Sequence, residues 1–154
     1  MRLVLDTNTA VSGLIWGGVP GRLIDAAAAG KALIIASVPL LDELQGVLSR
    51  RKFSGQLAKL NANVDDLFDG YAALVRLVAP SAIGPVILAD PDDDIVLATA
   101  VGGSADAIVS GDACFSPSAK GLPGARRSRQ NVSVTAMSRT KTSEMMRRRM
   151  KPGI

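Results

Sequence analysis

The 154-residue sequence predicts one domain of the α/β class. Short apolar runs of strand length alternate with longer segments whose apolar residues recur at helical spacing, and this alternation is typical of that class. Apolar residues make up 47% of the sequence and aromatic residues only 3%. The core must therefore be built mainly from Ala, Val, Leu and Ile, which suits packed layers of strands and helices.

The first half of the sequence predicts two strand–helix pairs. Two apolar runs have strand length, and turn or cap residues follow each of them. Pro20-Gly21 favours a helix start, Gly30 favours a helix end, and Ser37 can cap the helix after the second strand. The predicted elements are a strand at residues 2–5, turn and cap residues at 7–9, a loop containing Gly17 and Gly18, a helix at 22–29, a strand at 32–36, and a helix that buries Leu40, Leu41, Leu44, Val47 and Leu48.

The second half predicts more helix than strand. Apolar residues keep a helical spacing until Pro80 interrupts the pattern, and beyond Asp112 the sequence becomes rich in Ser, Gly, Pro and Arg. The predicted elements are two helices within residues 53–78, an acidic turn at 90–94, a helix at 95–101, a strand at 107–110 and one further strand at 132–137.

Residue types that are rare or missing restrict the possible chemistry. The chain has no histidine, which excludes a Ser-His-Asp triad, general-base catalysis by histidine and the usual zinc sites. Cys114 is the only cysteine, so no disulfide can form within the chain and we expect a cytoplasmic location. No apolar stretch approaches the length of a bilayer span, so we expect no membrane association. Catalysis is left to carboxylates, hydroxyls, amines or a hard metal ion.

Charge is distributed unevenly along the chain. Residues 1–112 carry 8 Lys and Arg against 13 Asp and Glu, a net charge of −5, whereas residues 113–154 carry 10 against 1, a net charge of +9. Such a basic tail attracts polyanions through a salt-sensitive term that does not depend on sequence. Arg126, Arg127 and Arg129 are therefore candidate RNA contacts, and a solvated or disordered extension is the alternative.

Four carboxylates lie where the predicted fold would bring them together. Asp6 and Asp112 come directly after predicted strands, Asp94 begins a predicted helix, and Glu43 lies near the start of another. Parallel α/β sheets bind ligands outside the carboxyl ends of their strands. Clustered carboxylates repel one another unless a cation compensates, and oxygen ligands alone suit Mg²⁺ or Mn²⁺. The pattern therefore predicts hydrolysis of nucleic acid by a metal-activated water.

Each of these carboxylates could also have an ordinary structural role. Asp6 and Asp112 could be turn residues, and Glu43 alone would be a solvated helix residue. Asp94 has acidic neighbours, Asp90, Asp92 and Asp93, which are rival ligands or charges that favour a helix N-terminus. The set of four is therefore more specific than any one member.

Four segments of the chain together resemble a known family. They are Val4-Leu5-Asp6-Thr7-Asn8, then Leu41-Asp42-Glu43-Leu44, then Asp90-Pro91-Asp92-Asp93-Asp94, and finally Ile108-Val109-Ser110-Gly111-Asp112. The combination resembles the PIN-domain family, and more closely its bacterial toxin components of toxin–antitoxin systems, the VapC-like ribonucleases.

This resemblance implies a three-layer α/β/α fold with a central, mostly parallel sheet, a Mg²⁺ or Mn²⁺ site and RNA as substrate. Asp6, Glu43, Asp94 and Asp112 match the metal-binding and catalytic positions of the family. The matches to supporting positions are Asn8, Asp92 and Ser110. Relatives often form homodimers and, when they are toxins, are blocked by a cognate antitoxin.

The resemblance covers residues 1–113, which we expect to form the PIN-like domain with an atypical C-terminal part. From Ala113 onwards the sequence departs from the family, which usually continues with a leucine-rich turn, a last strand and a short helix. Two interpretations of residues 114–154 stay open. The segment is either an authentic basic extension without a regular fold, or the product of a reading frame that shifted near Ala113.

Two other functions remain as alternatives. In phosphatases of the haloacid-dehalogenase type, an aspartate after the first strand attacks phosphorus and a carboxylate two residues later protonates the leaving group. The second position here is Asn8, which cannot act as an acid. The other alternative is a catalytically impaired module that binds RNA or a protein partner. Salt-sensitive RNA binding that Asp6→Asn leaves unchanged, without cleavage, would favour that module.

Overall fold

The computed structural model describes residues 1–82, 91–111 and 133–136, and it describes only the backbone of residues 91–93 and 133–136. The strands are β1 (Arg2–Leu5), β2 (Leu33–Ala36), β3 (Val75–Leu77), β4 (Ala107–Ser110) and β5 (Ser133–Ala136). The helices are α1 (Thr7–Trp16), α2 (Gly18–Ala28), α3 (Val38–Leu48), the 3₁₀ turn η1 (Arg51–Phe53), α4 (Ser54–Lys59), α5 (Val64–Leu74) and α6 (Pro91–Gly102).

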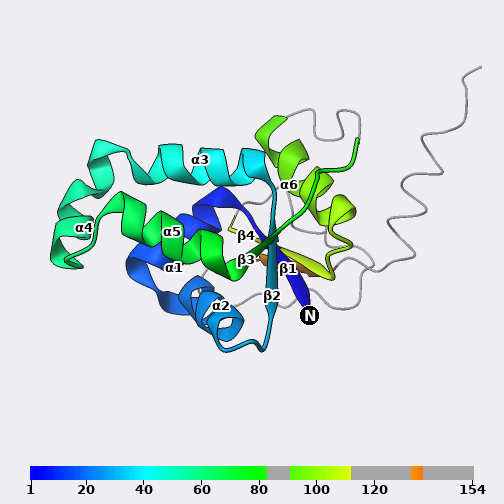
Figure 1. The fold of residues 1–154 in the computed structure, drawn as a ribbon, viewed down its shortest axis with the longest axis horizontal. Helices are drawn as coiled ribbons and strands as arrows, with labels where there is room; N and C mark the ends of the chain where they lie inside the picture. Colours follow the sequence, from blue (N-terminus) through cyan, green and yellow to red (C-terminus); the bar gives the residue numbers. More distant parts are fainter. Residues whose placement is uncertain (83–90, 112–132, 137–154) are drawn as a thin grey trace, which may run out of the picture.

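The strands form one sheet in the order β3-β2-β1-β4-β5 (Figure 1). The first four of these run parallel, and β5 is antiparallel to β4. β1 occupies the centre, where Leu3 lies opposite Ile34 of β2 and Ala107 of β4. The expected α/β class with a mostly parallel sheet is confirmed, and the carboxyl ends of four strands lie along one edge.

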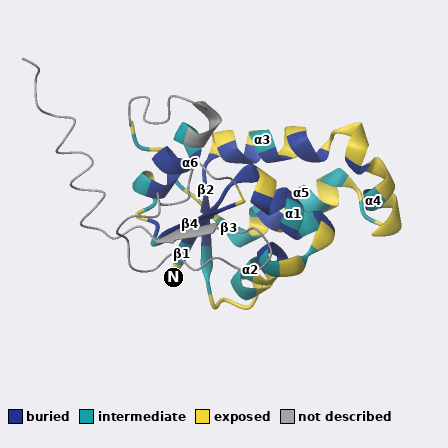
Figure 2. Cartoon of the chain, turned by 180° about the vertical axis from the view of Figure 1, so that it is seen from behind, coloured by how far each residue is buried: buried dark blue, intermediate teal, exposed yellow. Residues whose placement is uncertain are grey.

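Apolar side chains cover both faces of the sheet and make a three-layer α/β/α arrangement. Successive residues of a strand point to opposite faces, so Leu5 and Val4 of β1 join different cores. The core around Leu5 contains side chains from α1, α2, α3 and α5, whereas the core around Val4 is covered by α6. Figure 2 shows the buried residues gathered along the sheet and on the inner sides of these helices.

Helix α1 forms where we expected a turn and a loop, so that prediction was wrong. The Asp6 side chain caps the helix by accepting a hydrogen bond from the backbone N–H of Thr9 at 2.6 Å. Gly13 lets α2 approach closely, because a Cβ at that position would lie only 2.8 Å from the Ile24 side chain. Gly17, at φ 72°, then ends α1 and lets α2 begin at Gly18. Capping and packing thus outweigh the low helix propensity of Thr, Val and Ile in this segment.

Two other boundaries differ from the predicted ones. The helical spacing that we extended to residue 78 ends at Leu74, and residues 75–77 form β3 beside β2. Helix α6 begins at Pro91, inside the segment expected to be an acidic turn. The strand expected within residues 132–137 is confirmed as β5. Throughout the described ranges, no helix is both long and apolar enough to cross a membrane.

Candidate metal-binding site

The candidate site lies at the sheet edge where the parallel strands end. Asp6 directly follows β1, Ser37 follows β2, and Ser110 is the last residue of β4. Helices α1 and α3 both begin at this edge, directly after Asp6 and Ser37. Because helix N-termini carry partial positive charge, this edge favours carboxylates and other anions.

Asp6 is held rigidly by hydrogen bonds on both sides of its carboxylate. The side chain is 4% exposed, and its backbone N–H donates to the Val109 carbonyl at 3.1 Å. Oδ1 accepts the hydrogen bond from the Thr9 N–H, and Oδ2 accepts one from the buried hydroxyl of Ser110. Each carboxylate oxygen has two lone pairs, so each keeps one that can ligate a cation.

Glu43 is hydrogen-bonded to Thr7, the residue directly after Asp6. The Thr7 hydroxyl, on the first residue of α1, donates to Oε2 of Glu43 at 2.7 Å. Glu43 is half-buried on α3, and its other carboxylate oxygen receives no hydrogen bond from a described residue. Glu43 is therefore tied to the residue that follows Asp6, at the start of α1.

Asp94 approaches from the opposite layer. It is half-buried in the first turn of α6 and takes part in further interactions there. A buried hydrogen bond of 2.7 Å joins the hydroxyls of Ser37 and Thr99, which connects the start of α3 to α6 beneath the sheet edge. Within residues 1–82 and 94–111, no three acidic or cysteine side chains are close enough together to hold a metal ion.

Several predicted site residues lie outside the described part of the chain. They are Asp112, the side chain of Asp92, and Arg126, Arg127 and Arg129. Asn8 is described and exposed on the first turn of α1. Ser110 is fully buried and contacts Asp6, so it is well placed to orient that carboxylate.

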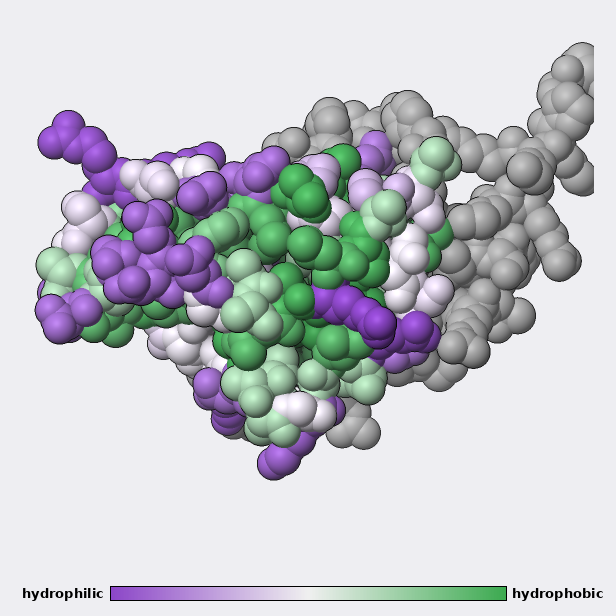
Figure 3. Space-filling model, viewed as in Figure 1, coloured by the Kyte–Doolittle hydropathy of each residue, from purple (hydrophilic) through white to green (hydrophobic). Residues whose placement is uncertain are grey.

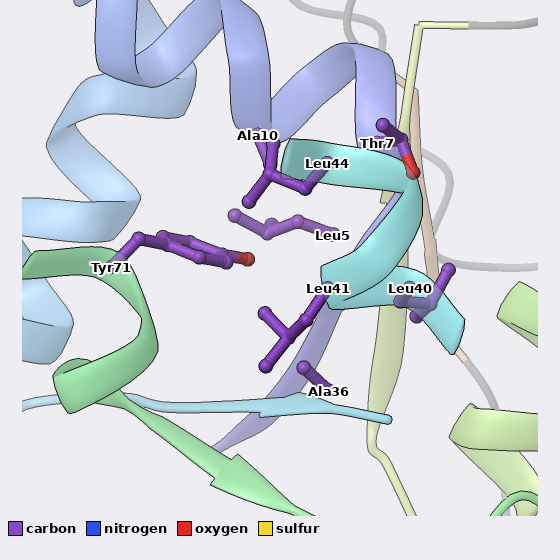
Figure 4. Close-up of a pocket in the computed structure, with 8 residues that line it drawn as sticks. All are labelled: Leu5, Thr7, Ala10, Ala36, Leu40, Leu41, Leu44 and Tyr71. Carbon is purple, nitrogen blue, oxygen red and sulfur yellow. The ribbon is translucent and has the colours of Figure 1, made fainter. Parts of the chain in front are cut away.

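Sequence reasoning missed Tyr71. Its side chain is 4% exposed on α5, and its hydroxyl points into a small pocket that also reaches Thr7 (Figure 4). Burial, and then the negative charge of Asp6, raise the pKa of the Tyr71 phenol above its ordinary range, so the phenol stays neutral at physiological pH. The cavity volume is about 10 Å³, so no nucleotide base fits inside the pocket.

The donor set at this edge fits a hard divalent cation. Asp6 is buried yet forms no ion pair with any described Lys or Arg, although an ionised buried carboxylate needs compensation. Its available oxygen lone pairs, together with those of Glu43, are the ligands that Mg²⁺ and Mn²⁺ prefer. Thr7 and Ser110 would then act as the outer groups that fix the orientation of the ligands.

Comparison with known proteins gives one match. The family model described as PIN domain matches residues 2–113, which is more than half of the chain. No protein in the curated set and no solved structure matches the chain. The matched range includes Asp6, Glu43, Asp94 and Asp112.

Proposed function

The chain belongs to the PIN-domain family, whose members are generally nucleases, and from that premise we propose that it is a metal-dependent endoribonuclease. The single observation that carries the proposal is the buried carboxylate of Asp6. The Thr9 backbone N–H and the Ser110 hydroxyl orient it, and no described cation pairs with it. Glu43 is hydrogen-bonded to Thr7, the next residue along the chain. Such an arrangement costs free energy unless a cation binds to it.

In this proposal Asp6, Glu43, Asp94 and Asp112 hold Mg²⁺ or Mn²⁺, with Asp92 as a supporting carboxylate. When bound, the metal supplies an activated water and stabilises the charge that develops on the phosphate. Ser110 and Thr7 keep the carboxylates oriented, and Asn8 lies exposed on the same helix turn, where it can contact substrate. The N-terminus of α1 adds partial positive charge close to the scissile phosphate.

Within the family, we further propose a VapC-like toxin of a toxin–antitoxin pair that acts in the cytoplasm on RNA. Residues 1–113 form the catalytic domain in this proposal, and Arg126, Arg127 and Arg129 of the basic tail bind RNA phosphates. A cognate antitoxin and a second copy of the chain are the proposed protein partners. A gene for a small antitoxin next to the gene for this chain would support that part of the proposal.

The proposal is tested by incubating purified protein with labelled RNA of mixed sequence and Mn²⁺, Mg²⁺ or EDTA. We expect cleavage only with metal, and we expect Asp6→Asn to lower the cleavage rate at least about 100-fold, because the ligand charge is lost. Asn is as good a helix cap as Asp, so this variant keeps α1 intact. Asp25→Asn is the matched control, because Asp25 is an exposed carboxylate on α2.

Three outcomes would change the conclusion. Cleavage that survives EDTA or equals wild type in Asp6→Asn would contradict a metal site at Asp6. Salt-sensitive binding without cleavage would favour the impaired RNA-binding module. Turnover of a small phosphomonoester with RNA left intact would favour a phosphatase.

A further inference from the structure

An exposed tryptophan lies at the end of α1. Trp16 is the only tryptophan of the chain and is 58% exposed, although large aromatic side chains are usually buried. Its ring meets the ring of buried Phe53 edge-on, with centroids 5.7 Å apart and an interplanar angle of 68°. One edge of the indole is therefore anchored while much of the ring stays in solvent.

Positive charge lies beside the Phe53 ring that Trp16 contacts. The Lys52 ammonium lies 4.8 Å from the centroid of Phe53, the same ring that Trp16 contacts. Arg50, Arg51 and Lys52 are consecutive, exposed, and form no ion pair with any described residue. Trp16 and these three cations are called the Trp16 patch below. Figure 3 shows hydrophilic side chains gathered at the end of the molecule where α4 follows η1.

The three cations stand out because residues 1–112 are acidic as a whole. The nearest carboxylates along the chain are Asp42 and Glu43 on α3. The next ones towards the C-terminus, Asp65 and Asp66, belong to the first turn of α5, where they stabilise that helix N-terminus. A single exposed apolar residue is common on protein surfaces and indicates nothing by itself. An indole anchored on Phe53, with three exposed cations in the segment that leads into Phe53, is a different combination, because it offers both an aromatic face and positive charge.

The Trp16 patch lies within reach of the candidate metal site. Helix α1 begins after Asp6 and ends at Trp16, so ten residues separate the two, about 15 Å along the axis. Helix α3 carries Glu43 and ends at Leu48, just before Arg50. The contact between Trp16 and Phe53 brings the far ends of these two segments together. A strand of a few nucleotides can span this distance.

We propose that the Trp16 patch binds single-stranded RNA on one side of the scissile phosphate, with a base stacked on Trp16 and phosphates bound by Arg50, Arg51 and Lys52. Stacking on an aromatic ring combined with contacts from basic side chains is how proteins hold single strands without reading sequence. A protein partner would more readily cover Trp16 with apolar groups and pair the cations with carboxylates. The inference rests on RNA being the substrate of the proposed nuclease.

The single tryptophan makes the test direct. The full chain in EDTA, which prevents cleavage, is titrated with a 12-nucleotide single-stranded RNA of mixed sequence while Trp16 fluorescence is recorded. Anisotropy of the same RNA carrying an end label measures binding independently. We expect saturable quenching of Trp16 emission at the RNA concentrations that saturate the anisotropy signal.

Variants separate stacking from charge. Trp16→Ala should weaken RNA binding about fivefold or more, whereas Trp16→Tyr should keep most of it, because stacking on an aromatic ring is worth ~1–3 kcal/mol per base. Arg51→Ala with Lys52→Ala should weaken binding and reduce the slope of log affinity against log salt by about 1.4, for two lost phosphate contacts. Arg76→Ala with Lys31→Ala removes the same charge from exposed positions on β3 and before β2, and should leave the slope unchanged.

The outcomes separate this inference from the proposed function. RNA binding by anisotropy without any change in Trp16 emission would overturn the inference and leave the nuclease proposal standing. Quenching of Trp16 emission by RNA, together with the expected effects of the Trp16, Arg51 and Lys52 variants but without metal-dependent cleavage, would support the inference. It would count against the proposed nuclease. Trp16 emission that changes with protein concentration but not with RNA concentration would also overturn the inference, because a second copy of the chain would then cover the ring.

Discussion

The neutral phenol of Tyr71 couples ionisation to folding. Its pKa in the folded chain is raised above the ordinary value of 10.0, first by burial and then by the charge of Asp6. Above about pH 10 the unfolded chain loses this proton while the folded chain keeps it, so the free energy of unfolding falls as pH rises. Below that pH the phenol is neutral in both states and contributes no pH dependence.

We therefore expect an alkaline loss of stability that depends on Tyr71. Urea unfolding of wild type should show the free energy of unfolding falling by up to about 1.4 kcal/mol per pH unit above pH ~10 from this group alone. Tyr71→Phe removes the titrating group and should reduce that slope while changing stability at neutral pH by less than about 1 kcal/mol. Equal slopes for the two proteins would show that the phenol is not protected in the folded chain.

At the scale of single residues, Asp6 could be predicted because a carboxylate that directly follows a buried apolar strand contrasts sharply with its neighbours. Thr7 and Tyr71 carried no such signal. Thr7 was interpreted as a turn residue, although its hydroxyl contacts Glu43 36 positions along the chain. Tyr71 fits the helical spacing of α5 like any core residue, and only the packing of α5 against α2 and α3 reveals that its hydroxyl points into the pocket that Thr7 also lines.

At the scale of elements, the hydroxyl pair of Ser37 and Thr99 joins the helix that carries Glu43 to the one that carries Asp94. Thr99 donates to the Ile95 carbonyl at 2.7 Å, so Ser37 must donate to Thr99. Ser37 is the N-cap residue of α3, yet its side chain makes no capping hydrogen bond because it is engaged across the core. Both side chains are fully buried. Losing Thr99 leaves the Ser37 hydroxyl without a partner, whereas losing Ser37 leaves Thr99 with only its bond to the Ile95 carbonyl.

We expect a double-mutant cycle to detect this link. Ser37→Ala and Thr99→Val should each lower the free energy of unfolding by about 1–3 kcal/mol, and the coupling energy should be about 0.5–1.5 kcal/mol. Ser49→Ala is the control, because the Ser49 hydroxyl is exposed and bonds only the Gln45 carbonyl, and it should change stability by less than about 0.5 kcal/mol. Additive effects in urea unfolding would show that the pair does not join the two helices energetically.

Predictions of elements succeeded where local patterns dominate. The strands at residues 2–5 and 107–110 contain the continuous apolar runs Leu3-Val4-Leu5 and Ala107-Ile108-Val109, which are typical of buried parallel strands. The prediction failed for α1, whose helix depends on the Asp6 cap and on close packing of Gly13 against α2. It also failed for β3, because residues 75–77 continue the apolar spacing of α5 and only pairing with β2 makes them a strand.

At the scale of the whole molecule, β5 is the outermost strand next to β4, and its residues lie beyond the range that the family model matches. It pairs with all four residues of β4, from Ser110 opposite Ser133 to Ala107 opposite Ala136. Without it, the backbone groups on that side of β4 would lie open to another chain. The strand that ends at Ser110, and hence the contact between Ser110 and Asp6, depends on this neighbour.

Removal of β5 by truncation tests whether β4 depends on this strand. A chain ending at residue 132 should have a free energy of unfolding about 2–4 kcal/mol below that of a chain ending at residue 136, if each lost ladder bond contributes roughly 0.5–1 kcal/mol. We also expect the shorter chain to associate on size-exclusion chromatography, because its β4 edge is open. Identical urea midpoints and elution volumes would show that β5 does not stabilise the sheet.

The hydrogen bond between Ser110 and Asp6 spans 104 positions of the chain. Asp6 leaves the ribosome well before β4, which supplies its partners, has been synthesised. The central strand β1 cannot pair with β4 until β4 has been translated, after the intervening helices. Contacts between residues so far apart in the sequence slow folding. A chain with this topology would be unable to orient the Asp6 carboxylate until nearly the whole of the matched domain had been made.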